Sequence, residues 1–325
     1  QSNTTASNNT AVGSRSLLTN TTGTNNTAVG FEAGFAVTTG VQNTLIGNFA
    51  GDALTIGGAN VALGYEALSG EDANSYNTAI GYQTLKVQNA SSNGYNTAVG
   101  AEAGKAVSTG VQNTLLGAQS GEYLTGGSNN VVVGAFAAAH SVGTTTGSQN
   151  VILGNYADTT AADTTNANIM GFDVSGAAGF TTLGNGTADI RAQHGIITWA
   201  TVSDERYKKE IVDSTAGLAL INALRPRTFK YKTLGELPET FSVYKADSTE
   251  VFKNTQTNHG FIAQEIKAAI DADDSIKDGF RLWDERDDGS QEVAEAALIP
   301  ILVKAIQEQS ALITALTDRI AALEG

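Results

Sequence analysis

The sequence predicts a mainly β N-terminal part, a trimeric parallel β-solenoid or β-roll of 17-residue repeats, followed by an α+β domain that ends in a coiled-coil helix. Three observations predict this fold class. A glycine recurs about every 17 residues through the first half of the chain, charged residues become dense from Ser203 onward, and isoleucines recur every seven residues near the C-terminus. The chain therefore divides into a repetitive, low-charge part and a compact, charged part.

The glycine repeat is regular. Glycine occupies positions 13, 30, 47, 64, 81, 100, 117, 134, 154 and 171, and every step but two is 17 residues. The two longer steps predict short insertions at 87–93 and 141–147. The residue before each glycine is Val, Ile, Leu or Met, and in the first nine units Asn stands four residues before it, as in NTAVG at 26–30. Seventeen residues are too few for a helical hairpin, so the short β-branched runs predict one or two strands per unit.

Stacked units would rise by about 4.8 Å each. The recurring Asn side chains are then expected to form an internal hydrogen-bond ladder. Two adjacent positions in each unit are apolar, such as Ala28 and Val29, and in a strand these point to opposite faces. One face can fill the core of the coil, and the other needs a cover, most simply from neighbouring chains. The units, over residues 8–171, resemble the head repeats of trimeric autotransporter adhesins and the NTAIG repeats of phage tail fibres, which also indicates a homotrimer.

Composition excludes several classes of partner. The net charge of −14 argues against binding to nucleic acid. The chain has no Cys, and no uninterrupted apolar run approaches the length of a membrane span, so we expect no membrane insertion. We expect no cofactor and no metal site. The acids of the repeat are scattered, and the one adjacent pair, Glu71 and Asp72, lies in a loop and is expected to be a solvated turn rather than the acid pair of a glycosidase.

We expect four segments. Residues 1–171 form the repeat shaft, 172–202 a β-rich neck, 203–297 a compact, charged α+β domain, and 298–325 a coiled-coil helix. The first residue, Gln1, is not Met, so the chain is expected to be a fragment or a processed product, with other proteins N-terminal to it. The patterns that predict the third segment are helical spacing in LALINALRP (218–226), alternation in TFKYK (228–232), and an extended start followed by an amphipathic helix in HGFIAQEIKAAI (259–270).

The C-terminal segment carries a heptad pattern. Its a positions are Ile299, Ile306, Ile313 and Ile320, and its d positions are Leu302, Gln309, Leu316 and Leu323. The pattern predicts a coiled coil, and the alternative is an amphipathic helix packed on its own domain. Ile at a with Leu at d favours two strands, whereas Gln at one d position weakens that preference, so the number of strands does not follow from the heptads. Three strands follow from the repeat argument and from the resemblance described next.

Four elements occur in order in the charged part: SDERYKKEI (203–211), LALINALRPRTFKYK (218–232), HGFIAQEI (259–266) and the heptad helix. Together they resemble the endosialidase-type intramolecular chaperone domain of phage tailspikes and fibres. The resemblance implies that the domain trimerises, templates the folding of the β-structure before it, and then cuts itself off at the Val202–Ser203 bond. It also implies a Ser–Lys dyad, in which Ser203 is the nucleophile and Lys208 the base. His259 lies within the matching HGFIAQE motif and is expected to pack rather than to catalyse.

The chemistry of the opening segment is consistent with that implication. Ser203 needs a base to take its proton. Lys208 can serve only when neutral, which requires burial or nearby positive charge, and Arg206 and Lys209 supply charge. Five residues are about 1.4 helical turns, so Ser203 and Lys208 would not align on one regular helix. The alternative, that Ser203 and Asp204 simply cap a helix, stays open on the residues alone.

The resemblance, together with the repeat, implies a phage tail fibre or tailspike protein for host attachment, whose only catalytic activity is that of a single-turnover, self-cleaving serine endopeptidase. We expect folding in the host cytoplasm, a final location in the virion tail, and a host-surface receptor such as a glycan or an outer-membrane component. Two alternatives remain: a tailspike that depolymerises polysaccharide, and a trimeric surface adhesin that never cleaves.

Overall fold

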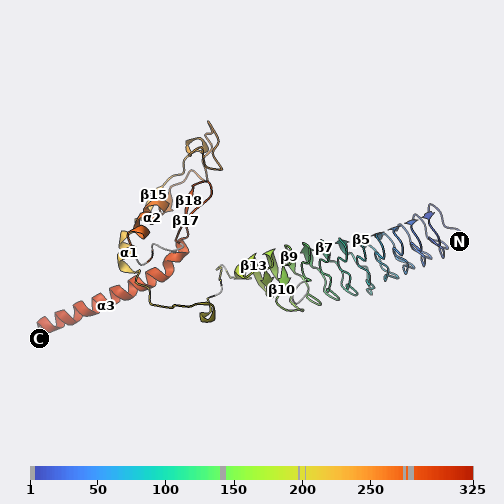
Figure 1. Cartoon of the computed structure of the whole chain (residues 1–325), viewed down its shortest axis with the longest axis horizontal. Helices are drawn as coiled ribbons and strands as arrows, with labels where there is room; N and C mark the ends of the chain where they lie inside the picture. Colours follow the sequence, from blue (N-terminus) through green and yellow to red (C-terminus); the bar gives the residue numbers. More distant parts are fainter. Residues whose placement is uncertain are drawn as a thin grey trace. The chain divides into compact units, whose positions relative to one another are not determined.

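The computed structural model describes residues 4–139, 144–196, 198–201, 203–273, 276 and 282–324. The chain forms two compact units, Gln1–Asp204 and Glu205–Gly325. Figure 1 shows a row of short strands in the first unit and a long C-terminal helix, α3, in the second. Each unit is described by itself.

The first unit is a β-solenoid in which each coil contributes one short strand to a single sheet. The sheet runs in the order β1-β2-β3-β4-β5-β6-β7-β8-β9-β11-β13-β14. The pairs from β1 to β13 are parallel, with Thr27 opposite Thr44 and Ile46 opposite Leu63. The strands of the repeat are β1 (Thr10–Val12), β2 (Thr27–Val29), β3 (Thr44–Ile46), β4 (Val61–Leu63), β5 (Thr78–Ile80), β6 (Thr97–Val99), β7 (Thr114–Leu116), β8 (Val131–Val133) and β9 (Val151–Leu153). The predicted solenoid with 17-residue spacing is confirmed.

The sheet continues past the last repeat glycine. Strand β11 (Asn168–Phe172) pairs with β9 and with β13 (Phe180–Asn185), and β13 forms an antiparallel hairpin with β14 (Ala188–Gln193). The antiparallel hairpin ends the parallel stack. Two further short strands, β10 (Asp158–Thr159) and β12 (Ser175–Gly176), pair with each other beside the main sheet.

The recurring Asn residues form the expected ladder inside the solenoid. The backbone N–H of Asn43 donates to Asn26 Oδ1 at 2.9 Å, and that of Asn60 donates to Asn43 Oδ1 at 3.0 Å. Most of these side chains also close their own coil, as Asn43 Nδ2 does by donating to the carbonyl of Gly57 at 2.9 Å. Buried backbone groups need such partners, so a single Asn per coil satisfies both the coil above and the loop beside it.

Glycine is required where the coils touch. Gly47 has φ +135°, a conformation that side chains rarely adopt, and a Cβ there would lie 2.3 Å from the carbonyl oxygen of Gly64 in the next coil. The residues three positions after these glycines, such as Ala50 and Ala67, are small and fully buried, as the close spacing of the coils requires. The middle residue of each strand, such as Ala62, points into the same core.

Replacing Gly47 with Ala should therefore destabilise the solenoid strongly. The new methyl group would be forced against backbone, which cannot move as a side chain can, and the positive φ adds about 1–3 kcal/mol of strain. The matched control is Gly126→Ala, where φ is ordinary and the nearest atom to a new Cβ is Thr109 Oγ1 at 3.4 Å. Urea unfolding should show a large loss of stability for Gly47→Ala and almost none for Gly126→Ala. Equal midpoints for the two variants would show that the coils do not approach each other this closely.

The outer face of the sheet carries an apolar stripe. In β4, Val61 and Leu63 flank the buried Ala62 and point to the opposite face, where Leu63 is 44% exposed. The stripe consists of Val12, Val29, Ile46, Leu63, Ile80, Val99, Leu116, Val133, Leu153 and Met170, none of which is fully buried in the single chain. This is the second apolar face that the repeat pattern predicts.

The second unit is small and α+β. Its elements are η1 (Glu205–Tyr207), α1 (Leu218–Ala223), β15 (Arg227–Phe229), η2 (Leu234–Glu236), β16 (Asn258–Gly260), α2 (Ala263–Asp271), β17 (Trp283–Glu285), β18 (Gln291–Val293), η3 (Glu295–Ala297) and α3 (Leu298–Glu324). Ile266 and Ile270 of α2 pack with Leu282 and Leu298, which form one core cluster. A second cluster joins Leu220 of α1 to Ile301 of α3, so the start of α3 is packed on its own domain.

Candidate functional site

The expected cleavage segment lies at the boundary between the two units. Val202, which carries the acyl side of the expected scissile bond, lies outside the described residues. Ser203 is exposed and belongs to the first unit, whereas Lys208 is exposed and belongs to the second. Between them, η1 is a single 3₁₀ turn, and the Lys208 N–H donates to the carbonyl of Glu205 at 2.9 Å.

Two expected roles concern this segment: helix capping by Ser203 and Asp204, and base catalysis by Lys208. Asp204 precedes a single 3₁₀ turn, so no regular α-helix begins here for Ser203 or Asp204 to cap. A neutral lysine base requires desolvation or neighbouring positive charge. Lys208 and Arg206 are both exposed, so the single chain does not bury this segment. The Ser203–Lys208 dyad remains a prediction.

His259 lies on β16, away from the core clusters. It is opposite Thr228 of β15 in the antiparallel pair, and its side chain is exposed. In a single chain it therefore does not pack as the sequence predicts for this motif. Beside it, Arg227 of β15 donates from Nε to Glu265 Oε2 at 2.9 Å, which ties the strand pair to the first turn of α2. This ion pair lowers the pKa of Glu265.

Helix α3 has two different faces. Leu298, Ile301 and Ala305 are buried, and Glu308 Oε2 accepts the backbone N–H of Leu218 at 2.8 Å. The heptad positions lie on another face and are all exposed: Ile299, Leu302, Ile306, Gln309, Ile313, Leu316, Ile320 and Leu323. The first turns of α3 therefore pack on their own domain, as the alternative to a coiled coil predicts, but they do so with residues that are not at a or d positions. The a and d face is left without a cover in one chain.

The length and composition of the same region also meet the requirements for a membrane span. The segment Glu295–Glu324 is long and apolar enough to cross a bilayer, although charged and polar residues interrupt its apolar runs. A span of this kind is apolar all round, whereas the apolar residues of α3 follow a heptad with Lys304, Glu308, Asp318 and Arg319 between them. The spacing therefore favours a helix–helix contact.

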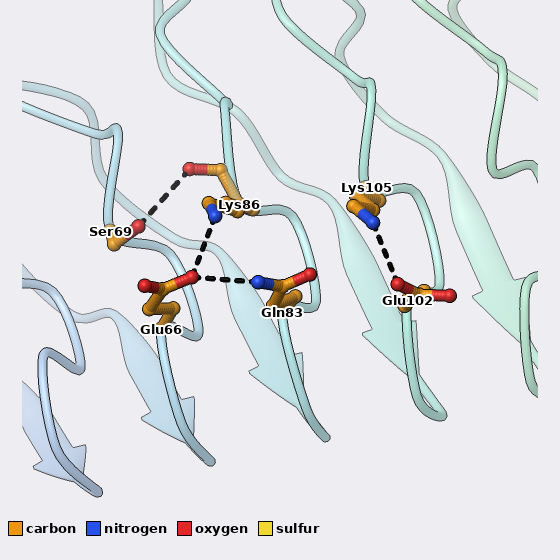
Figure 2. A network of polar contacts seen from close by, with 6 residues as sticks. All are labelled: Glu66, Ser69, Gln83, Lys86, Glu102 and Lys105. Atoms are coloured by element: carbon orange, nitrogen blue, oxygen red, sulfur yellow. Dashed lines mark hydrogen bonds and ion pairs between the residues drawn. The ribbon is translucent and has the colours of Figure 1, made fainter.

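Charged side chains on the solenoid form a network across coils. Figure 2 shows Glu66, Gln83 and Lys86 on two neighbouring coils, and Glu102 with Lys105 on the next. Glu66 Oε2 lies 2.6 Å from Lys86 Nζ and accepts a hydrogen bond from Gln83 Nε2 at 2.8 Å. Glu102 lies 2.6 Å from Lys105 Nζ. These contacts lower the pKa of Glu66, chiefly through Lys86, and of Glu102, chiefly through Lys105.

Sequence reasoning treated these acids as scattered and missed this network. The signal that could have found it is the repeat itself, since Glu66, Gln83 and Glu102 each stand two residues after a coil glycine and so occupy one column of the stack. Burial raises the pKa of Asp52 and of Glu122, in each case with a further contribution from neighbouring carboxylates.

The expectation of a solvated turn at Glu71 and Asp72 is wrong for Glu71. Asp72 is exposed, but the Glu71 side chain is 0% exposed and lies inside the solenoid. Its Oε1 accepts the backbone N–H groups of Ala73 at 3.1 Å and Asn74 at 2.8 Å. The turn folds back on itself so that the carboxylate caps these two N–H groups, which a reading of sequence polarity alone does not reveal.

The fold and the site define a class of protein: a β-solenoid segment followed by a small α+β domain whose C-terminal helix exposes its heptad face. Residues 203–274 match the model of the family described as Chaperone of endosialidase. A search of curated proteins and a search of solved structures each gave no match. The matched region starts at Ser203 and contains α1, β15, β16 and α2. Together with the solenoid it fits a tail fibre or tailspike with a C-terminal intramolecular chaperone domain.

Proposed function

We propose that this protein is a phage tail fibre or spike component for host attachment, and that its second unit brings three chains together, templates the solenoid and then releases itself by cutting at Val202–Ser203. The observation that carries the proposal is the exposed a and d face of α3, next to a segment that matches the endosialidase chaperone family. Both the homotrimer and the cleavage are part of the proposal.

The fold explains why such a helper would be needed. A parallel solenoid is built from contacts between coils, and a trimer must also set the register of three chains, so loop-closure entropy makes assembly slow and prone to aggregation. Three α3 helices that associate would hold the shafts at high effective concentration. In the trimer, the apolar stripe would be covered by the neighbouring chains. Removal of the second unit would then leave the shaft kinetically trapped.

In the proposed cut, the Ser203 Oγ attacks the carbonyl carbon of Val202 while neutral Lys208 takes the hydroxyl proton. Collapse of the tetrahedral intermediate breaks the Val202–Ser203 C–N bond and leaves an ester between Val202 and the Ser203 side chain. The Lys208 ammonium gives this proton to the Ser203 nitrogen, which leaves as the free amine at the start of residues 203–325. Water then hydrolyses the ester, which frees the Val202 carboxylate and restores the Ser203 hydroxyl. Arg206 and Lys209 would favour the neutral form of Lys208 by charge.

A polysaccharide-depolymerising function has one observation in its favour. Glu122, whose pKa burial raises, and Glu102, whose pKa is lowered, lie on neighbouring coils, and such divergence is typical of acid–base pairs. However, Glu102 is already bound to Lys105 and accepts a hydrogen bond from Gln119 at 2.7 Å. Attachment therefore remains the proposed function, and an assay for oligosaccharides released from host capsule distinguishes the two.

The chaperone role can be tested by removing the second unit. A chain that ends at Val202 should give aggregated or monomeric shaft, whereas the full chain should give a soluble trimeric shaft, because only the full chain carries the helix that assembles the three copies. Sedimentation velocity of both preparations, produced side by side, is the measurement. If the shorter chain forms the same trimer in the same yield, the second unit does not act as a folding device.

A further inference from the structure

The interior of the solenoid changes character in its fourth and fifth coils. In the coils that begin at Gly30, Gly47, Gly100 and Gly117, the residue seven positions after the glycine is aliphatic and at most 1% exposed: Val37, Leu54, Val107 and Leu124. The first coil has the buried Asn20 at this position. In the fourth and fifth coils the same position holds Glu71 and Gln88, both 0% exposed. An aliphatic column is thus interrupted by two adjacent polar side chains.

The neighbouring amides of these two coils are incompletely satisfied. Most other ladder asparagines donate from Nδ2 to a carbonyl 14 residues later, as Asn60 does to Asn74 at 2.9 Å. The fifth coil has the longer step and the insertion at 87–93, and Asn77 Nδ2 has no hydrogen-bond partner among the described residues. Gln88 Nε2 is equally without a partner there, although Gln88 Oε1 accepts from Asn96 Nδ2 at 3.1 Å. Buried polar atoms without partners cost stability.

We propose that Glu71, Asn74, Asn77 and Gln88 form a polar seam at which the shaft opens first near neutral pH and which acid tightens. Glu71 accepts hydrogen bonds from two backbone N–H groups and from Asn74 Nδ2, all of them uncharged donors. No cation among the described residues forms an ion pair with it. The ionised carboxylate is therefore held inside the solenoid without a compensating charge, which is unfavourable.

The charges around Glu71 reinforce this effect. The column neighbours, Leu54 on one side and Gln88 on the other, are uncharged. Asp72, the next residue, is an exposed acid that disfavours a second negative charge nearby. The backbone of Lys86 in the fifth coil lies close to Glu71, since its carbonyl accepts the Gly70 N–H at 2.7 Å. The Lys86 ammonium group, however, is bound to Glu66.

The direction of the pH effect follows from these contacts. Burial raises the pKa of Glu71 above its ordinary value of 4.5. Between the unfolded and folded pKa values the native state binds more protons than the unfolded state, so local stability is fully present at low pH and is lost as pH rises through the folded pKa. The seam should therefore be tighter in acid than near neutral pH.

Hydrogen exchange of the full chain at pH 4.5 and pH 7.5, corrected for intrinsic exchange rates, tests the proposal. At pH 7.5, residues 64–99 should be less protected than residues 30–63, and acidification to pH 4.5 should raise the protection of 64–99. Glu71→Gln should remove this pH dependence. The matched control is Asp72→Asn, which removes the adjacent exposed charge and should leave the pH dependence in place.

A second variant separates the titration from the unsatisfied amides. Gln88→Leu restores an aliphatic residue to the column and should raise protection of 64–99 at both pH values while the pH dependence persists. The proposal is overturned if Glu71→Gln shows the same pH dependence as the natural chain, or if residues 64–99 and 30–63 are equally protected at pH 7.5. Should Glu71→Gln fail to fold, the natural chain still tests the proposal, since equal protection of residues 64–99 at pH 4.5 and pH 7.5 would overturn it.

Discussion

The Ser203→Ala chain should remain whole, while the natural chain separates into two pieces that meet at Val202 and Ser203. Without the hydroxyl there is no nucleophile, and loss of one member of a catalytic pair lowers the rate by at least about a thousandfold. Lys208→Ala should have the same result, since no base then takes the serine proton. Denaturing gel electrophoresis with intact-mass analysis measures both the extent of cutting and its position.

The matched control for this prediction is Lys209→Ala. Lys209 is the neighbouring lysine and is also exposed in the single chain, but it stands outside the proposed dyad, so its removal should slow cutting only through the loss of nearby charge. Cutting of Ser203→Ala at the natural rate would exclude Ser203 as the nucleophile. A natural chain that stays whole would favour a permanent trimerising cap, as in the non-cleaving adhesin alternative.

The Ile306→Asp chain should be monomeric. Ile306 is an a position in α3 and is 64% exposed in one chain, so the substitution leaves the core of the domain untouched. In a trimer the same position faces its two counterparts, and three unpaired carboxylates would be buried together at a cost of about 3–5 kcal/mol each. Light scattering after size-exclusion chromatography gives the mass of the assembly directly.

Ala311→Asp is the control for Ile306→Asp. Ala311 is an exposed residue of the same helix at an f position, opposite the a and d face, and it receives the same charge. We expect this variant to assemble like the natural chain. If both variants assemble normally, the heptad face is not the contact between chains, and α3 would need another partner, with a lipid bilayer tested next because of its length and composition.

Most of the fold could be predicted because the same residue types recur at the same spacing from coil to coil. The spacing of Gly47 and Gly64, together with one Asn per unit, is sufficient to predict coils stacked strand on strand with an internal amide ladder. The same periodicity separates the buried Ala62 from the exposed Leu63. The heptad in α3 likewise predicts a face distinct from the one that packs on the domain.

Other features could not be predicted from local sequence patterns, because they depend on which residues meet in the folded structure. The burial of Glu71 follows from a turn that offers two backbone N–H groups, whereas its position next to Asp72 in a Gly-preceded loop indicates exposure. The pairing of Glu66 with Lys86 depends on the coil-to-coil register. The single chain does not bury Ser203 or Lys208, so it does not fix how the two side chains lie relative to each other.

The central claim is that the second unit assembles three shafts and then leaves them. Native mass spectrometry of the purified protein tests it most directly, since one spectrum reports both the number of chains and the length of each. The account predicts a species of three chains, each ending at Val202, with the second unit as a separate product. A spectrum that contains only full-length monomer would contradict both the assembly and the release.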